Sequence, residues 1–458
     1  MIETLILLPF TFWAAIILFL LGGLVAVRKL RCGLGIPMLA ILATVFFWYV
    51  GDVMYNDYPN YLHKVFSDDV LSIAWLEVCS FLLAFLIFVK LLNRKSRRSF
   101  SNAYLLYRGG INYLEIQLVT KQFFKICLVI WCVLVVFAFI IIGGKAVWYV
   151  LPILGQKVNP FARGQIGGGM SAFYSLAQYF YILVGAGFGV VAAMTKDRRI
   201  FRLAIIGCIL VWPYFILDRT RSSMVAVCLP GILVWIFYRL QTSNKIRIVF
   251  LCVVLLIFNI WFMFVMGARS QGRQVADSFF QSSAGEIVQS GTRHLGLNMY
   301  EELCWLTSFI KRGTFQPNWG KRYFAELVNP VPRALWPGKP TIGLDYAVAR
   351  GQDVVDHSGT VSATISTGMI GQGVNNFGIF FGPIAAAFLM ALWATILAKI
   401  DTGGRVSLRQ PLYCIGLVLT FNFGRDITLL GMYPFFFGWL AILIAEGKLL
   451  LRRKRFAW

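Results

Sequence analysis

Apolar residues recur along this chain in long runs, and short polar segments separate the runs. A helix needs about 20 apolar residues to cross about 30 Å of hydrocarbon. The pattern therefore predicts an all-α integral membrane protein with about eleven transmembrane helices. The expected spans are residues 5–27, 34–53, 70–92, 124–143, 171–194, 201–217, 222–238, 247–267, 369–397, 407–424 and 427–446. A re-entrant hairpin remains an alternative for 407–424, which is short and contains Arg409 and Pro411.

The composition agrees with this pattern, because 59% of the 458 residues are hydrophobic and only 14% are charged. Residues 5–27 follow an acidic start and lack a small-residue cleavage site, which favours a retained span over a signal peptide. The nine cysteines include no Cys-x-x-Cys pair, and the three histidines lack metal-ligand spacing. The segment "GQIGGGM" lacks the Gly-Lys-Ser/Thr ending of a phosphate loop. We expect no metal, no nucleotide and no other cofactor.

The net charge of +23 suggests a nucleic-acid partner, but the positions of the basic residues favour a membrane topology signal. Basic residues cluster in every second loop, as they do on the cytoplasmic side of membrane proteins. This places the N-terminus outside (periplasmic) and the C-terminus in the cytoplasm of a bacterial inner-membrane protein. The clusters are Arg28, Lys29 and Arg31; Arg94, Lys95, Arg97 and Arg98; Lys196, Arg198 and Arg199; Arg239, Lys245 and Arg247; Lys399, Arg405 and Arg409; and the tail "KLLLRRKRFAW".

The same topology makes residues 268–368 a large external loop between an N-terminal bundle, 1–267, and a C-terminal part, 369–458. A loop of this length is usually functional or disordered. An amphipathic stripe formed by Leu297, Tyr300, Leu303, Cys304 and Leu306 predicts a helix in it. The segment "NPVPRALWPGKP", 329–340, holds four of the fifteen prolines and predicts a rigid external turn. Trp336 in this segment is expected to anchor it in the membrane interface.

Arginines on the predicted outer face run against the usual bias of short external loops. One interpretation is local ion pairing, Arg219 with Asp218 and Arg425 with Asp426, together with interfacial snorkelling. The other is a cluster of guanidinium groups that bind a phosphate-bearing substrate, since each can hold phosphate oxygens bidentately. The residues are Arg163, Arg219, Arg221, Arg269, Arg273, Arg293, Arg333, Arg350 and Arg425.

The chain contains three short motifs. The first is Pro-Arg…Trp-Pro…Lys-Pro, at 332, 333, 336, 337, 339 and 340. The second is Thr-Arg-Ser at 220–222, and the third is Asn-Phe-Gly at 376–378. Together they resemble the O-antigen polymerase type of oligosaccharide repeat-unit polymerases, which are related to O-antigen ligases. The resemblance implies a GT-C-like helical membrane fold. Family members often carry a Glu four residues before that Asn, whereas this chain has Gln372, which leaves a general base at that position in doubt.

The resemblance also implies a reaction: metal-independent polymerisation of undecaprenyl-pyrophosphate-linked repeat units into a surface polysaccharide such as lipopolysaccharide. The partners would be the lipid-linked donor and acceptor, membrane lipid and a chain-length regulator protein. The expected catalytic residues are His357, Arg333 and Asp356, with Asp345, Glu301 and Glu302 as other candidates for the base. The expected pyrophosphate-binding residues are Arg219, Arg221, Arg273, Arg425, Lys339 and Asn376.

The opening of the ninth span, "GMIGQGVNNFGIFFGP", combines glycines with buried amides. Small residues let membrane helices approach closely, so Gly371, Gly373, Gly378 and Gly382 favour tight packing. Amides at membrane depth usually face a cavity or a partner, which favours a functional role for Gln372, Asn375 and Asn376.

Three other functions remain open. An O-antigen ligase shares the chemistry. A flippase or transporter usually shows internal repeats with paired broken helices, and no matching halves are visible here. A non-catalytic assembly partner would not need arginines gathered on the outer face.

Overall fold

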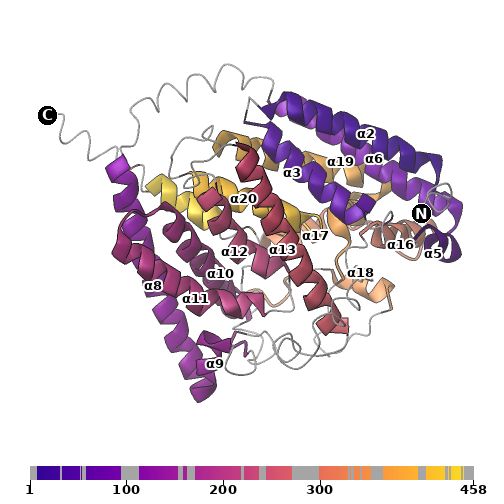
Figure 1. Cartoon of the computed structure of the whole chain (residues 1–458). Coiled ribbons are helices and arrows are strands. Elements are labelled where there is room, and N and C mark those ends of the chain that lie inside the picture. The colour runs from indigo at the N-terminus through magenta and orange to yellow at the C-terminus, as the bar shows by residue number, and fades with distance from the viewer. Residues whose placement is uncertain are drawn as a thin grey trace. The chain divides into compact units, whose positions relative to one another are not determined.

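The computed structural model describes residues 8–30, 33–51, 53, 58–93, 113–152, 158–161, 171–217, 221–236, 244–270, 299–328, 331, 335–340, 343–351, 365–400, 409–428, 432, 435–444 and 447. These residues are helical and include no strand, which confirms the all-α class (Figure 1). Six helical stretches are long and apolar enough to cross a membrane, as in a multi-pass membrane protein. They are Phe10–Arg28, Asp68–Leu92, Ile116–Val150, Leu176–Met194, Arg198–Ile216 and Gly368–Ile400.

Shorter apolar helices coincide with the other expected spans. They are Gly35–Val50, Ser223–Val234, Leu256–Val265, Pro411–Phe423 and Phe435–Ile444. The helix α20 (Gln410–Phe423) has 14 residues, and a helix of that length extends only about 21 Å. The total of eleven spans, the GT-C-like arrangement and the orientation of the termini therefore stay predictions.

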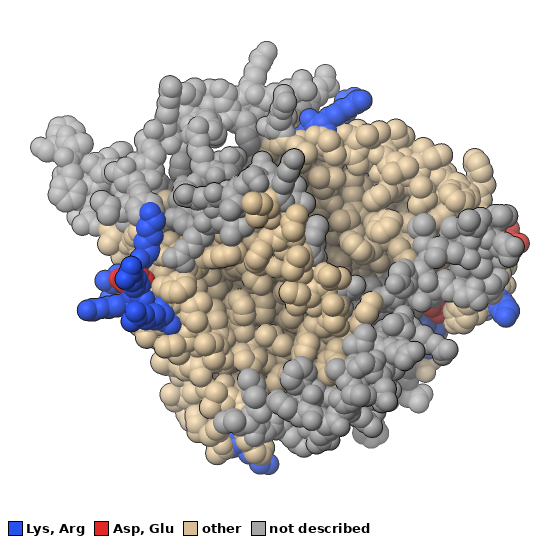
Figure 2. All heavy atoms as spheres, viewed as in Figure 1, with Lys and Arg blue, Asp and Glu red and all other residues tan. Residues whose placement is uncertain are grey.

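The membrane-type helices are α2 (Phe10–Arg28), α3 (Gly35–Val45) with η2 (Phe46–Val50), α6 (Asp68–Leu92), α8 (Tyr113–Ile142), α10 (Ser171–Met194), α11 (Arg198–Ile216), α12 (Arg221–Val234), α13 (Asn244–Ser270), α19 (Gly368–Ile400) and α20. Shorter elements are α5 (Tyr58–Val65), η3 (Gly143–Ala146), α9 (Val147–Val150), α16 (Met299–Lys311), α17 (Lys321–Val328) and α18 (Leu344–Ala349). Figure 2 shows broad areas of described surface that carry no charged side chain, as a lipid-facing surface requires.

The chain forms two compact units, each built from discontinuous segments. Unit 1 comprises Met1–Gly109, His294–Asp401 and Leu419–Leu430, and unit 2 comprises Gly110–Arg293, Thr402–Val418 and Gly431–Trp458. The described helices of the large loop thus belong to the same unit as α2, α3, α6 and α19. The sequence analysis divided the chain in order, into 1–267, 268–368 and 369–458. In the structure, each compact unit contains segments from all three of these parts.

In unit 2, α10 is the central helix and packs against α8, α11 and α12. Asp197 begins α11 by accepting a hydrogen bond from the backbone N of Arg199 at 2.8 Å, which is a standard N-cap. Glycine lets α10 and α12 approach closely, since a Cβ built at Gly231 would lie 2.7 Å from the Cα of Gly189.

In unit 1, α6 packs against α2 and α19, and α16 packs against both α6 and α19. Four residues of the expected amphipathic stripe, Tyr300, Leu303, Cys304 and Leu306, are buried on α16, which confirms this part of the prediction. Leu297 lies outside the described residues. Tyr300 stacks on Trp75 of α6, with ring centroids 4.1 Å apart. The large loop is therefore folded onto the helices of unit 1 through α16.

The helix α19 is broken at Gly378, whose φ of 78° and ψ of −179° are open essentially to glycine alone. A Cβ at Gly373 would overlap the carbonyl oxygen of Gly382, although nine residues of straight helix would separate the two by about 13.5 Å. The segment 368–377 therefore folds back beside the start of the second segment, 379–400. The expected single span 369–397 is corrected to two helical segments, and the tight glycine packing occurs within this one element.

Candidate functional site

Three of the predicted site residues have described side chains, and all three belong to unit 1: Lys339, Asn376 and Arg425. Arg221 begins α12, but its side chain is outside the described set. His357, Asp356, Arg333, Arg219 and Arg273 lie outside the described residues. The site is therefore built from unit 1 alone.

Helix α17 carries a buried arginine that the sequence analysis did not select. Oδ1 of Asn318 accepts a hydrogen bond from the backbone N of Arg322 at 3.4 Å, so this asparagine helps to begin the helix. The Arg322 side chain donates from Nη1 to Oγ1 of Thr367 at 3.0 Å and from Nη2 to Oδ1 of Asp426 at 3.1 Å. Arg322 is 5% exposed, and its buried Nε has no hydrogen-bond partner among the described residues.

The carboxylate of Asp426 completes a largely buried ion pair with Arg322. Burial raises the pKa of Asp426, while the Arg322 guanidinium and a hydrogen bond from Ser366 act in the opposite direction. The local pairing considered for Arg425 with Asp426 is not what forms. Nε of Arg425 donates instead to Oγ of Ser366 at 2.7 Å, on the exposed side. A buried charge held by a specific partner beside a cavity is a common feature of functional sites.

Gln372, on the first segment of α19, fixes the backbone next to Asp426. Its Nε2 donates to the carbonyl of Ile427 at 3.2 Å, and its Oε1 accepts from the amide N of Ile427 at 2.8 Å. Gln372 is fully buried. An amide can donate and accept at once, whereas an ionised glutamate only accepts. Gln372 thus has a structural role that an ionised glutamate could not fill.

The two asparagines of the same segment hold the start of α17. Asn318 donates from its backbone N to the carbonyl of Asn375 at 3.0 Å and from Nδ2 to Oδ1 of Asn375 at 2.7 Å. Oδ1 of Asn376 accepts from the backbone N of Tyr323 at 3.2 Å, and its Nδ2 donates to the carbonyl of Gln372 at 2.7 Å. Asn376, predicted to bind pyrophosphate, uses its amide oxygen to connect the broken helix to α17 and its amide nitrogen to bond within α19.

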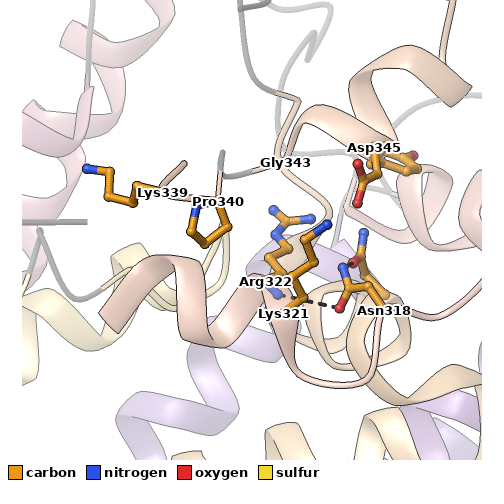
Figure 3. A pocket seen from close by; sticks show the side chains of 9 residues that line it. Asn318, Lys321, Arg322, Lys339, Pro340, Gly343 and Asp345 are labelled. Carbon is orange, nitrogen blue, oxygen red and sulfur yellow. Dashed lines mark hydrogen bonds between the residues drawn. The ribbon is translucent and has the colours of Figure 1, made fainter. Parts of the chain in front are cut away.

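A cavity of about 200 Å³ lies between α17, α18 and the first segment of α19. Figure 3 shows the side chains of Lys321 and Arg322 rising toward Gly343, with Asn318 and Asp345 beside them. The complete lining is Asn318, Lys321, Arg322, Lys339, Pro340, Gly343, Asp345, Tyr346 and Asn375. Two cations suit phosphate oxygens, while the carboxylate and the amides suit sugar hydroxyls. The cavity therefore has the chemistry to hold a phosphorylated sugar.

Lys339 lines this cavity, but its amine is directed elsewhere. Nζ donates to the carbonyl of Val331 at 2.8 Å, and in Figure 3 the amine points away from Arg322. The backbone N of Lys339 also donates to the carbonyl of Trp336 at 3.1 Å, which closes a turn. Within the described part of the proline-rich segment, Lys339 thus helps to hold the turn.

Three carboxylates were considered as alternatives for the base, and they differ in their surroundings. Glu302 accepts from Nε and Nη2 of Arg350, at 3.2 and 3.1 Å, and from the hydroxyl of Tyr346. Burial raises the pKa of Tyr346, and the nearby Glu302 adds to this shift, so the hydroxyl stays a donor. Glu301 accepts from Nε1 of Trp305 at 3.2 Å, a structural contact between residues four apart on α16. Asp345 lines the cavity and is exposed.

The residues that the sequence analysis did not select, Asn318, Lys321 and Arg322, lie in the segment "NWGKRYF", 318–324. Its Lys-Arg pair looks like ordinary loop charge until Asp426 and Thr367 are placed next to Arg322. Among the residues that the structure describes, no group of His, Cys, Asp or Glu side chains is arranged to hold a metal ion.

The chain was compared with protein-family models, curated proteins and solved structures, and it matches none of them.

Proposed function

We propose that this protein is a membrane glycosyltransferase that polymerises polyprenyl-pyrophosphate-linked oligosaccharide repeat units on the outer face of a bacterial inner membrane. The observation that carries the proposal is the cavity that holds Lys321 and Arg322 together with Asp345. Cations and sugar-binding groups occur in it side by side, which a glycosyl pyrophosphate requires. The sequence resemblance supplies the reaction class.

Arg322 is suited to bind the pyrophosphate. A guanidinium has five N–H donors, and the described contacts to Thr367 and Asp426 use one donor each. Arg322 lines the cavity, so its remaining donors on that side can bind phosphate oxygens while the group is already held in place. Such fixed donors stabilise charge that develops on a leaving group. The predicted arginines 333 and 425, which belong to the same unit as the cavity, would add to this charge.

The proposed reaction joins two lipid-linked glycans. An acceptor hydroxyl oxygen attacks the anomeric carbon of the donor, and the bond from that carbon to the pyrophosphate oxygen breaks. The electron pair leaves with the pyrophosphate. The hydroxyl proton passes to His357, the base implied by the resemblance, with Asp356 beside it in sequence. Asp345 binds hydroxyls of the sugar in the cavity.

The proposal is tested by deleting the gene and separating the surface polysaccharide of wild-type and deletion cells on a gel. Loss of the long-chain ladder with single repeats retained supports the polymerase. Loss of all capped material indicates a ligase, and lipid-linked repeats that accumulate on the inner side indicate a flippase. Either of these two results overturns the proposal.

A further inference from the structure

One face of α17 is apolar and exposed. Lys321, Phe324 and Leu327 lie three residues apart, so they share one side of the helix. Phe324 is 48% exposed and Leu327 is 63% exposed, while Arg322 on the other side is buried. The helix α17 therefore directs the side chain of Arg322 to its buried side and the apolar side chains of Phe324 and Leu327 to its exposed side.

The apolar face continues onto the proline-rich segment. The rings of Phe324 and Trp336 are 6.2 Å apart and nearly perpendicular, and Leu335 is 78% exposed. We call Phe324, Leu327, Leu335 and Trp336 the outer face of α17. A contiguous exposed apolar surface of this kind is typically covered by another protein or by lipid.

The position of α17 next to α19 indicates which of the two covers it. Tyr323 donates its backbone N to Asn376, and its ring packs 6.2 Å from that of Phe377. The second segment of α19 begins just beyond the kink and runs for about 22 residues, or about 33 Å, which matches the hydrocarbon thickness. Its first turn exposes Phe380 and Phe381 by 81% and 66%. Because these rings begin the spanning segment, they lie at an edge of the bilayer, and α17 lies at that level.

The geometry points to a lipid surface as the partner: the outer face of α17 lies in the membrane interface, at the boundary between headgroups and acyl chains. The face is continuous with the lipid-facing start of α19, and Trp336 has the amphipathic ring that this layer favours. Lys321, at the edge of this face, lines the cavity. This inference concerns placement in the bilayer and holds for any function of the cavity.

Placement at the interface has a consequence for ligands. Because Lys321 and Arg322 belong to the same helix as the outer face, a ligand can put its phosphate in the cavity while its hydrocarbon part stays in the bilayer. A water-soluble sugar phosphate would gain nothing from this arrangement. The site is therefore suited to phospholipid-like or polyprenyl-linked phosphates.

The test uses the purified wild-type chain in liposomes that contain a phosphatidylcholine with a diazirine near the carbonyl end of one acyl chain. After irradiation, mass spectrometry locates the cross-linked residues. We expect labelling of Phe324, Leu327 and Leu335 within about threefold of that on Phe380. The exposed residues 312–314, beyond the end of α16, should be labelled about tenfold less.

A matched pair of variants gives a second measurement. Leu327→Glu places a charge in the apolar layer and should lower the labelling of Leu335 several-fold, with Phe380 unchanged. Thr314→Glu, at an exposed position off the face, should change neither. Labelling of the wild-type outer face no higher than that of residues 312–314 would overturn the inference. So would a disulfide between two copies that carry Leu327→Cys in the same liposomes.

Discussion

Nη2 of Arg322 lies 3.1 Å from Oδ1 of Asp426, and the pair connects residues 104 positions apart in the sequence. The carboxylate orients the guanidinium without occupying all of its donors, because the contact between them uses one N–H of Nη2. Removing one member of such a buried pair leaves the other charge uncompensated. Mutation of either residue is therefore expected to affect the other.

Arg322→Lys keeps the charge but loses the planar fork that reaches Thr367, Asp426 and a ligand together. We expect Arg322→Lys to lower turnover nearly as much as Arg322→Ala, by about 10²–10³. Polymer formation at matched expression measures this. Arg312→Lys, an exposed change at the end of α16, is the control and should retain wild-type ladders. A full-length polymer from Arg322→Lys would show that only charge matters at this position.

His357 and Asp345 should affect the reaction differently. If His357 takes the proton, His357→Ala removes the acidic limb of the pH–rate profile and lowers kcat by about 10²–10⁴. Asp345→Asn removes a carboxylate from the cavity lining, so we expect it to raise KM and leave that limb in place. Steady-state kinetics with a purified lipid-linked donor distinguishes the two. The reverse pattern would assign the proton transfer to Asp345.

The ionisation of Asp426 should be visible in stability. Because burial raises its folded-state pKa, the folded protein binds this proton more tightly than the unfolded chain does. The resulting stability is present below the unfolded pKa of about 3.9 and is lost as the pH rises through the folded pKa. Asp426→Asn cannot ionise and should lack this loss. The measurement is the unfolding midpoint of both proteins in detergent at a series of pH values from acidic to neutral. Midpoints that change with pH in parallel for the two proteins would contradict the prediction.

The backbone contact inside α19 should be intolerant of a methyl group. A Cβ at Gly382 would overlap the backbone of Val374, and one at Gly373 would overlap Gly382 itself. We expect Gly373→Ala and Gly382→Ala to lower the thermal midpoint and the yield of folded protein. Gly144→Ala is the control and should keep the wild-type midpoint, because a Cβ there meets nothing nearby and this glycine does not have a positive φ. Wild-type midpoints for both α19 variants would mean that the two segments are not in contact.

The sequence predicted the elements whose signal is local. Long apolar runs located the helices, and helical spacing identified Tyr300, Leu303 and Cys304 as the buried face of α16. The fold-back at Gly378 was missed because four glycines in a span are also the pattern of ordinary helix packing. Only the backbone conformation distinguishes these two cases.

Arg322 was missed for a different reason. Nothing within the segment "GKRYF" separates a buried arginine from a solvated one, since its burial depends on Thr367 and Asp426. A single sequence contains no information on which distant residues meet. Asn376 shows the converse case, because its motif was recognised while its contacts, to Gln372 and Tyr323, could only come from the structure.

Gln372 offers the sharpest test of how this chain differs from the family it resembles. In the structure its amide both donates to and accepts from the backbone of Ile427. Gln372→Glu, which installs the family's residue, would remove the donor when ionised and leave the carbonyl of Ile427 unsatisfied, at about 1–3 kcal/mol. It would also place a second carboxylate beside the backbone of Ile427, the residue after Asp426, and like charges disfavour each other's ionisation.

We therefore expect Gln372→Glu to be less stable than the wild type at neutral pH and to recover in part at acidic pH, where a protonated carboxyl can donate again. Gln372→Met is the matched control, because it keeps the length of the side chain and loses both hydrogen bonds at every pH. Unfolding midpoints of the three proteins at neutral and acidic pH, with turnover at neutral pH, give the comparison. A Glu variant that is as stable as the wild type and more active would show that this position is a base site in which glutamine limits the rate. A Glu variant that falls to the level of Gln372→Met only at neutral pH would show that the amide is there to hold Ile427, and with it Asp426, in place.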